Sequence, residues 1–198
     1  PEVLHVTNPG LVITRVTGFG QTGPYRDRTA FATQAEALSG FAAINGDPDG
    51  PPLLPPIALT DEVAALVGAF ATMVAVHSGV GQVVDVNLIE SMLQLMGPLV
   101  PLYGLLGRTQ QRLGAGIPYT VPRNTYRCSD GGWIAVSSSA ESVAQRVLEL
   151  IGLGGDDRFR GFEARVAHRE LIDEHLGTWI AQRTRDEVLE EFERVHAA

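Results

Sequence analysis

The most regular apolar pattern in the chain is TDEVAALVGAFATMVAVH, which spans residues 60–77. Its large apolar side chains recur at helical spacing, at Val63, Leu66, Val67, Phe70, Met73 and Val74. Most of the remaining positions are Ala or Gly, so we expect a helix that is buried on several sides. Thr60 is its expected N-cap, and Ser78-Gly79 is its expected end.

Shorter strands and helices are predicted on both sides of this helix. The expected strands span 11–16, 82–86 and 133–136, and the other expected helices span 33–41, 88–96, 140–151, 164–182 and 184–196. Loops are expected at 18–30, 45–56 and 104–125. Thr184 and Glu187 predict a capping box at the start of the last helix. This alternation predicts an α/β protein.

Composition and charge exclude several classes of protein. With 44% hydrophobic and 19% charged residues, the 198-residue chain is not typical of a disordered protein. The net charge is −8, and the 15 basic residues, all Arg, form no cluster, so we expect no nucleic-acid partner. The apolar region 88–106 is interrupted by Glu90, Gln94 and two prolines, which makes it a poor membrane span. The absence of a signal-peptide pattern and a single cysteine, Cys128, predict a cytoplasmic protein.

The segment GFGQTG, residues 18–23, has G-x-G-x-x-G spacing and follows a predicted strand. In a dinucleotide-binding fold, the third glycine lies at the start of a helix whose N-terminus meets the pyrophosphate. Here residues 24–28, PYRDR, follow without an apolar helical period, which disfavours an NAD site. A glycine-rich turn at the carboxyl end of a strand can still line a ligand crevice.

Asp61 is the carboxylate with the most distinctive setting. We place it at the first position of the 60–77 helix, where the helix dipole and free N–H groups favour a negative charge. A carboxylate in this setting could act as a nucleophile. On chemistry alone, the favoured interpretation is that Asp61 and Glu62 only stabilise the helix start.

The remaining reactive side chains indicate no site of their own. The histidines lack H-E-x-x-H spacing, and His168 and His175 are more typical of a solvated helix surface than of a metal site. Cys128 has no activating partner in the sequence, so an inert thiol is expected. The serine-hydrolase pattern G-x-S-x-G is absent. We therefore expect no metal.

An ordered set of segments resembles the family III CoA-transferases, which include formyl-CoA transferase, carnitine CoA-transferase and α-methylacyl-CoA racemase. The segments are GFGQTGPY at 18–25, LSG at 38–40, NGDPDGPP at 45–52, IALTD at 57–61, GVGQVVDV at 79–86, YRCSDGGWIAV at 126–136, DRF at 157–159 and RVAHREL at 165–171. Each segment alone is weak, but the ordered set is specific. The resemblance implies part of the family's large, nucleotide-binding-type domain over residues 1–120 and a small α/β domain over 121–198.

The resemblance implies a covalent role for Asp61, which stands where the family has its aspartate nucleophile. The carboxylate would attack a donor acyl-CoA to give an aspartyl-acyl anhydride, and the CoA thiolate would return to form an aspartyl-CoA thioester. CoA would then leave on a small carboxylic acid acceptor. Coenzyme A and acyl-CoA are thus implied as substrates, with no permanently bound cofactor. Neither the donor nor the acceptor acid is identified by the sequence.

The resemblance also implies residues that contact CoA. They are Gly18, Phe19, Gly20, Thr29, Ala30, Phe31 and Ala32. Ala32 stands where the family more usually has an acidic residue. Phe31 stands near the position of the catalytic histidine of the racemases, and its side chain cannot transfer a proton. CoA transfer is therefore favoured over an acyl-CoA racemase or epimerase.

Two further implications concern the whole protein. Family members form interlocked homodimers, so self-association is expected. They also carry an N-terminal nucleotide-binding half and further chain at the C-terminus, so this sequence resembles a fragment. A catalytically incomplete fragment that acts only in assembly is therefore a third interpretation. Thioester exchange, α-proton exchange into deuterated water, or neither, distinguishes transferase, racemase and assembly module.

Overall fold

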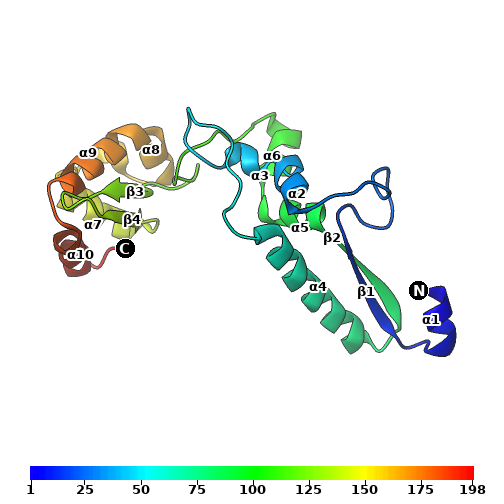
Figure 1. The fold of residues 1–198 in the computed structure, drawn as a ribbon. Helices are drawn as coiled ribbons and strands as arrows, with labels where there is room; N and C mark the ends of the chain where they lie inside the picture. Colours follow the sequence, from blue (N-terminus) through cyan, green and yellow to red (C-terminus); the bar gives the residue numbers. More distant parts are fainter. The chain divides into compact units, whose positions relative to one another are not determined.

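The computed structural model describes residues 1–198 and divides them into two compact units, Pro1–Arg112 and Leu113–Ala198. The first unit contains α1 (Glu2–Thr7), β1 (Val12–Thr17), α2 (Ala32–Leu38), α3 (Phe41–Ile44), α4 (Leu59–Ser78), β2 (Gln82–Asn87), α5 (Leu88–Leu95) and α6 (Leu99–Leu106). The second contains β3 (Arg123–Arg127), β4 (Trp133–Ser137), α7 (Glu141–Leu150), the 3-10 helix η1 (Asp157–Phe159), α8 (Phe162–Ala167), α9 (Arg169–Ala181) and α10 (Arg185–Arg194). Figure 1 labels the α-helices and β-strands of each unit. Both units combine helices with strands, so the expected α/β class is confirmed.

A parallel pair of strands lies at the centre of the first unit. β1 pairs with β2 in a register that runs from Val12 opposite Gln82 to Thr17 opposite Asn87. Parallel strands need a long crossover, and here it carries α2, α3 and α4. α4 runs alongside both strands (Figure 1) and contacts them through Gly68. The buried core between these elements consists of Ala35, Ala64, Val86, Leu88 and Met92.

The prediction that the 60–77 helix is buried on several sides is wrong. α4 buries a single face, which consists of Thr60, Ala64, Gly68 and Ala75. Leu66, Phe70 and Met73 are 71%, 74% and 64% exposed. Ala64 and Gly68 of α4 pack toward β1 and β2, whereas most of the large apolar side chains of the helix are exposed. The apolar pattern therefore predicts the helix correctly but overestimates how much of its surface is buried.

α4 is long and apolar enough to raise the question of whether it crosses a membrane. By length and composition alone, α4 could cross a membrane, and α5 with α6 passes the same test as a pair bent by 75°. Core helices of soluble proteins meet the same criteria, so composition alone does not define a span.

Two predicted helices are each divided by a local break. The 33–41 segment forms α2 and the short α3, because Gly40 at the junction has φ of +89°, a conformation that glycine adopts without strain. The 164–182 segment forms α8 and α9, which meet at His168. α1 and α6 are not among the predicted helices; α6 begins after Pro98, and prolines are tolerated in the first turn of a helix.

The second unit is an antiparallel hairpin packed against helices. β3 pairs with β4 from Arg123 opposite Ser137 to Arg127 opposite Trp133. Its core consists mainly of Val121, Val136, Val147, Leu148, Phe159, Ile172, Leu176, Ile180, Val188 and Phe192. The predicted capping box of the last helix is confirmed, because the hydroxyl of Thr184 accepts from the Glu187 N–H while the Glu187 carboxylate accepts from the Thr184 N–H.

An ion pair between the buried Arg165 and the half-exposed Glu141 connects three segments of the second unit. Arg165 is fully buried, and its guanidinium donates to the Val121 carbonyl at 2.9 Å and to the Glu141 carboxylate at 2.5 Å. The same carboxylate accepts from the Gly161 N–H at 3.1 Å. These bonds hold α8 and the N-terminus of α7 against the chain that leads into β3.

Candidate functional site

The carboxyl ends of β1 and β2 form one edge of the parallel pair, and the GFGQTG turn lies directly beyond it. The Gly20 N–H donates to the hydroxyl of Thr17 at 2.9 Å. The Gln21 N–H donates to the Asp85 carboxylate at 2.8 Å. Gly20 has φ of +84°, which a side chain would strain. These bonds join the turn to the ends of both strands.

A crevice of about 380 Å³ opens at this edge. Its lining includes Phe19, Gly20, Thr22, Tyr25, Asp85 and Asn87. Phe19 and Tyr25 meet edge to face with ring centroids 5.4 Å apart, and the Arg28 guanidinium lies 4.0 Å from the centre of the Tyr25 ring. No helix follows Gly23 until α2 begins at Ala32, so the turn lacks the helix N-terminus that an NAD pyrophosphate requires. Ligands of open α/β sheets bind at such strand ends.

The segment that the family resemblance places against CoA packs on this turn. A Cβ on Gly18 would lie only 2.5 Å from the Cβ of Ala30, so only glycine permits this approach. Phe31 is the N-cap residue of α2 and is 70% exposed, and its N–H donates to the Gln34 side chain at 2.9 Å. Ala32 is the first residue of α2. The structure therefore brings two of the predicted groups, residues 18–20 and 29–32, into contact.

Asp61 lies in the first turn of α4, but not at the predicted position. The helix begins at Leu59, with Ala58 as its N-cap residue, so Asp61 is the third residue and Thr60 is not the cap. The prediction failed because the hydroxyl of Thr60 has a different partner, the carboxylate of Glu36, at 2.9 Å. Asp61 is exposed, at the end of the helix that carries partial positive charge.

Glu36 is a buried carboxylate next to the first turn of α4, and the sequence analysis did not single it out. It lies one turn into α2, is 4% exposed, and accepts from Thr60, which is fully buried. A signal was present, because Glu36 is the sole charged residue among residues 29–46. A lone carboxylate in such an apolar stretch suggests a specific partner, although the partner itself is 24 residues away.

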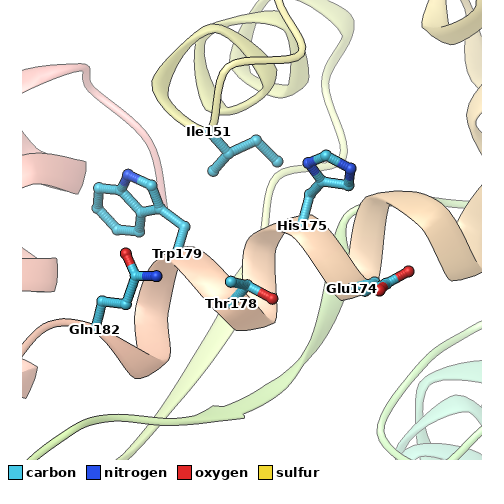
Figure 2. A pocket seen from close by; sticks show the side chains of 6 residues that line it. All are labelled: Ile151, Glu174, His175, Thr178, Trp179 and Gln182. Carbon is cyan, nitrogen blue, oxygen red and sulfur yellow. The ribbon is translucent and has the colours of Figure 1, made fainter.

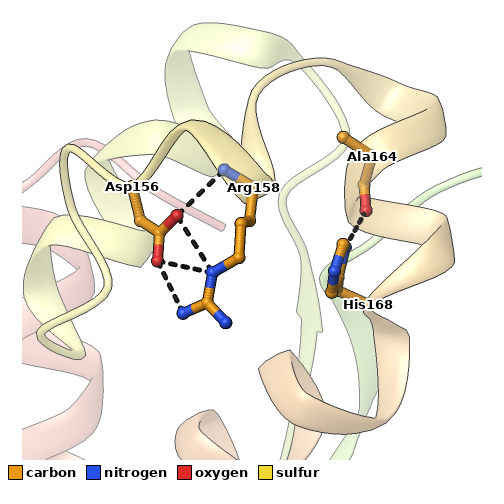
Figure 3. A network of polar contacts seen from close by, with 4 residues as sticks. All are labelled: Asp156, Arg158, Ala164 and His168. Carbon is orange, nitrogen blue, oxygen red and sulfur yellow. Dashed lines mark hydrogen bonds and ion pairs between the residues drawn. The ribbon is translucent and has the colours of Figure 1, made fainter.

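The polar groups of the second unit form separate features. A crevice of about 350 Å³ follows one side of α9, where His175 and Trp179 point toward Ile151 (Figure 2). Hydrogen bonds from the side chain and the N–H of Arg158 lower the pKa of Asp156. His168 makes a separate hydrogen bond to the carbonyl of Ala164 (Figure 3). His168 and His175 thus have separate surroundings.

Cys128 fits the expected inert thiol. Its side chain is buried, and burial raises the pKa of the thiol, with the nearby Asp130 carboxylate acting in the same direction. A raised thiol pKa reduces the thiolate fraction, which is the reactive form.

The first unit is thus an α/β fold with a glycine-rich turn at the edge of a parallel strand pair and with an exposed carboxylate, Asp61, in the first turn of α4. Asp61 is not among the residues that line the crevice at this turn. Residues 1–198 match the CoA-transferase family III along their whole length. The chain belongs to this family.

Relatives of known name are CoA-transferases. Succinyl-CoA–D-citramalate CoA-transferase of Chloroflexus aurantiacus is 39% identical over 194 residues, which are 94% of this chain and 48% of the relative. The alpha subunit of a succinyl-CoA–L-malate CoA-transferase from the same organism is 36% identical over 195 residues, 94% of this chain and 46% of the relative. This chain therefore spans about half the length of the curated relatives it matches.

This chain also matches about half of the length of similar solved structures. A CaiB/BaiF family protein from Brucella suis superposes with a TM-score of 0.79 at 28% identity, over 100% of this chain and 54% of that protein. A protein from Mycobacterium tuberculosis superposes with a TM-score of 0.81 at 25% identity, over 100% of this chain and 54% of that protein.

Proposed function

We propose that the protein represented by this chain transfers CoA from an acyl-CoA to a carboxylic acid, with Asp61 as the nucleophile. The observation that carries the proposal is the position of Asp61, exposed on the turn of α4 that Thr60 ties to α2. The N-terminal end of a helix stabilises the negative charge that develops on oxygen when a carbonyl is attacked. The names of the relatives support the same reaction class.

In the first half of the proposed reaction, an oxygen of Asp61 attacks the thioester carbonyl of the donor. The carbon–sulfur bond breaks, CoA leaves as a thiolate, and a mixed anhydride forms. The thiolate then attacks the aspartyl carbonyl, the anhydride carbon–oxygen bond breaks, and the donor acid departs as a carboxylate. Asp61 is left as an aspartyl-CoA thioester.

In the second half, the acceptor carboxylate attacks the aspartyl thioester and releases CoA as a thiolate. A second mixed anhydride forms, now between Asp61 and the acceptor. The thiolate attacks the carbonyl of the acceptor, which leaves as its CoA thioester, and the free carboxylate of Asp61 returns. Atoms balance without a metal, an oxidant or a bound cofactor.

Contacts with CoA are proposed for Gly18, Phe19 and Gly20 of the turn and for Thr29, Ala30, Phe31 and Ala32 of the adjoining segment. Relatives act on succinyl-CoA together with citramalate or malate, which supports a small dicarboxylic or hydroxy acid as acceptor. We also propose a homodimer located in the cytoplasm; the alpha and beta subunits of the malate enzyme show that related chains can assemble.

Oxygen labelling tests this mechanism. In the second half-reaction, the bridging oxygen of the anhydride comes from the acceptor and stays on Asp61. With citramalate labelled by heavy oxygen at its carboxylates and succinyl-CoA as donor, the peptide that contains Asp61 should therefore gain label during turnover, as mass spectrometry can show. Turnover that leaves Asp61 unlabelled would overturn the covalent route. If a protein that contains this chain and has the length of its relatives showed no thioester exchange, the transferase assignment would be overturned.

A further inference from the structure

Glu36 is a buried carboxylate with a single hydrogen bond to its side chain. Its Oε1 accepts from the hydroxyl of Thr60 at 2.9 Å, and no arginine or histidine forms an ion pair with it. Both residues are almost completely buried, at 4% and 0% exposure. Burying a carboxylate is costly unless its surroundings compensate. The hydroxyl of Thr60 is the one side-chain group that compensates for this burial.

This hydrogen bond joins the two segments of the candidate site. Glu36 is one helical turn after Ala32, the start of α2, and Thr60 directly precedes Asp61 in α4. The first turn of α4 has no side-chain cap, because Ala58 occupies the N-cap position. Uncapped helix ends fray. The bond from Thr60 to Glu36 is thus the side-chain contact that holds this turn in place.

We propose that Glu36 is a positioning residue for Asp61. Through Thr60, it fixes the first turn of α4 against α2, so that the Asp61 carboxylate stays at a set distance from the segment that starts α2. The inference rests on the proposed role of Asp61 as the nucleophile. Displacing a reacting group by about 1 Å can cost on the order of 100-fold in rate, so even slight fraying of this turn matters.

A purely structural role makes a different prediction. Thr60 and Glu36 border the core formed by Ala35, Ala64 and Met92, so their removal also lowers the free energy of unfolding. Loss of stability alone changes the amount of folded protein and leaves the rate per folded molecule unchanged. Positioning changes kcat while the KM for the acyl-CoA stays constant.

Substitutions at Thr60 separate these roles. Thr60→Val keeps the shape and removes the donor, whereas Thr60→Ser keeps the donor. We expect Thr60→Val to lower kcat about tenfold or more with the KM for acyl-CoA unchanged, and Thr60→Ser to restore most of kcat. Thr72→Val is the matched control, because Thr72 also makes side-chain hydrogen bonds in α4, to Thr14 and the Gly68 carbonyl, but far along the helix from Asp61. Equal kcat in Thr60→Val, Thr72→Val and the wild type would overturn the proposal.

Hydrogen exchange tests the same step without catalysis. In the 198-residue chain, Thr60→Val should speed amide exchange in the first turn of α4 and leave exchange in the middle of the helix unchanged. If Thr60→Val does not fold, Glu36→Gln replaces it, since the amide keeps the volume and weakens the acceptor. Unchanged exchange in the first turn would overturn the proposal.

The Asp61→Asn variant keeps this inference separate from the proposed function. Full activity of Asp61→Asn would show that the nucleophile assignment has failed, whatever Thr60 does. An inactive Asp61→Asn together with unchanged kcat in Thr60→Val would leave the transferase mechanism standing and refute the positioning role of Glu36.

Discussion

Two acidic side chains stand next to each other in the first turn of α4, and only one of them is proposed to react. Asp61 and Glu62 are both exposed, and both meet the positive end of the helix. Asp61 follows Thr60, whose hydroxyl is fixed by Glu36, so its backbone is held by a buried contact. Glu62 is one residue further from that contact. The difference between the neighbours allows a controlled test.

Replacing Asp61 should abolish CoA transfer. Asp61→Asn removes the charged oxygen nucleophile and keeps the shape, and Asp61→Ala removes the group altogether, so both should lose activity by several orders of magnitude while the fold is kept. Each should also lose the helix-dipole contribution to stability of about 0.3–1 kcal/mol. Glu62→Gln is the control: it loses a similar stability increment and keeps activity. Activity measured by thioester exchange in Asp61→Ala at the wild-type rate would rule out the mechanism.

Phe31 gives a prediction at the residue scale that distinguishes the transferase from the racemase. A racemase must remove the α-proton of the thioester, and the exposed phenyl ring at this position offers no base. We expect no deuterium uptake at the α-carbon of a 2-methylacyl-CoA in deuterated buffer, as followed by NMR. Rapid uptake would show that another side chain supplies the base and would favour the racemase.

The Glu141–Arg165 pair predicts how the second unit responds to acid. The hydrogen bond from Arg165 is the main cause that lowers the pKa of Glu141, and burial partly opposes it. A carboxyl whose pKa is lower when folded stabilises the fold above its unfolded pKa, ~4.3, and this contribution disappears as the pH falls through the folded pKa. The midpoint of urea unfolding should therefore decrease below about pH 4 in the wild type. Glu141→Gln should lower the midpoint at neutral pH and flatten this acid dependence; an unchanged pH profile would contradict the assignment.

At the scale of elements, the sequence predicted the segments that have a repeating apolar or β-rich pattern. It missed the features that depend on residues far away in the chain. The apolar period of 60–77 and the β-rich runs at 11–16 and 82–86 are local signals, and α4, β1 and β2 match them within two residues. The Thr184–Glu187 capping box is equally local and is confirmed. Thr60 satisfies the same local rule for an N-cap, yet its hydroxyl bonds to Glu36 in another helix. A tertiary contact therefore overrode the local preference, and no local rule predicts it.

The capping box of α10 gives a prediction at this scale. The hydroxyl of Thr184 satisfies the Glu187 N–H, so Thr184→Ala should lower the free energy of unfolding by about 1 kcal/mol. Thr184→Ser keeps the oxygen and should cost little. Chemical denaturation followed by circular dichroism measures both. Equal stability of Thr184→Ala and Thr184→Ser would show that this cap does not contribute.

At the scale of the whole molecule, the candidate site also combines features that local sequence signals predict with contacts between distant residues that they do not. The sequence places Asp61 near a helix start and residues 18–20 at a strand end, and the structure has both there; their roles in catalysis and CoA binding come from the family resemblance and stay predictions. Residues 18 and 30 contact each other through a loop that has no periodic signal, and only the structure shows this. The apolar pattern of α4 does not by itself predict its exposure, since it shows which side chains avoid water but not which segments cover them; the resemblance to a fragment is what predicts incomplete cover, and Leu66, Phe70 and Met73 are exposed.

The exposed side of α4 leads to the last prediction. Leu66, Phe70 and Met73 lie on one exposed surface of α4, beside a sheet of only two parallel strands, and parallel sheets are normally covered on both faces. Exposed apolar patches above a few hundred Å² mark interfaces or cause aggregation, so the isolated 198-residue chain should associate in sedimentation velocity. Phe70→Ser combined with Leu66→Ser should shift the chain toward monomer, and Glu62→Gln should not.

The isolated chain should also bind CoA weakly in calorimetry. Its crevice of about 380 Å³ is near the lower limit of ligand pockets, ~300 Å³, while CoA is a large ligand. A stable monomer that binds CoA with micromolar affinity would show that these 198 residues build a complete site on their own.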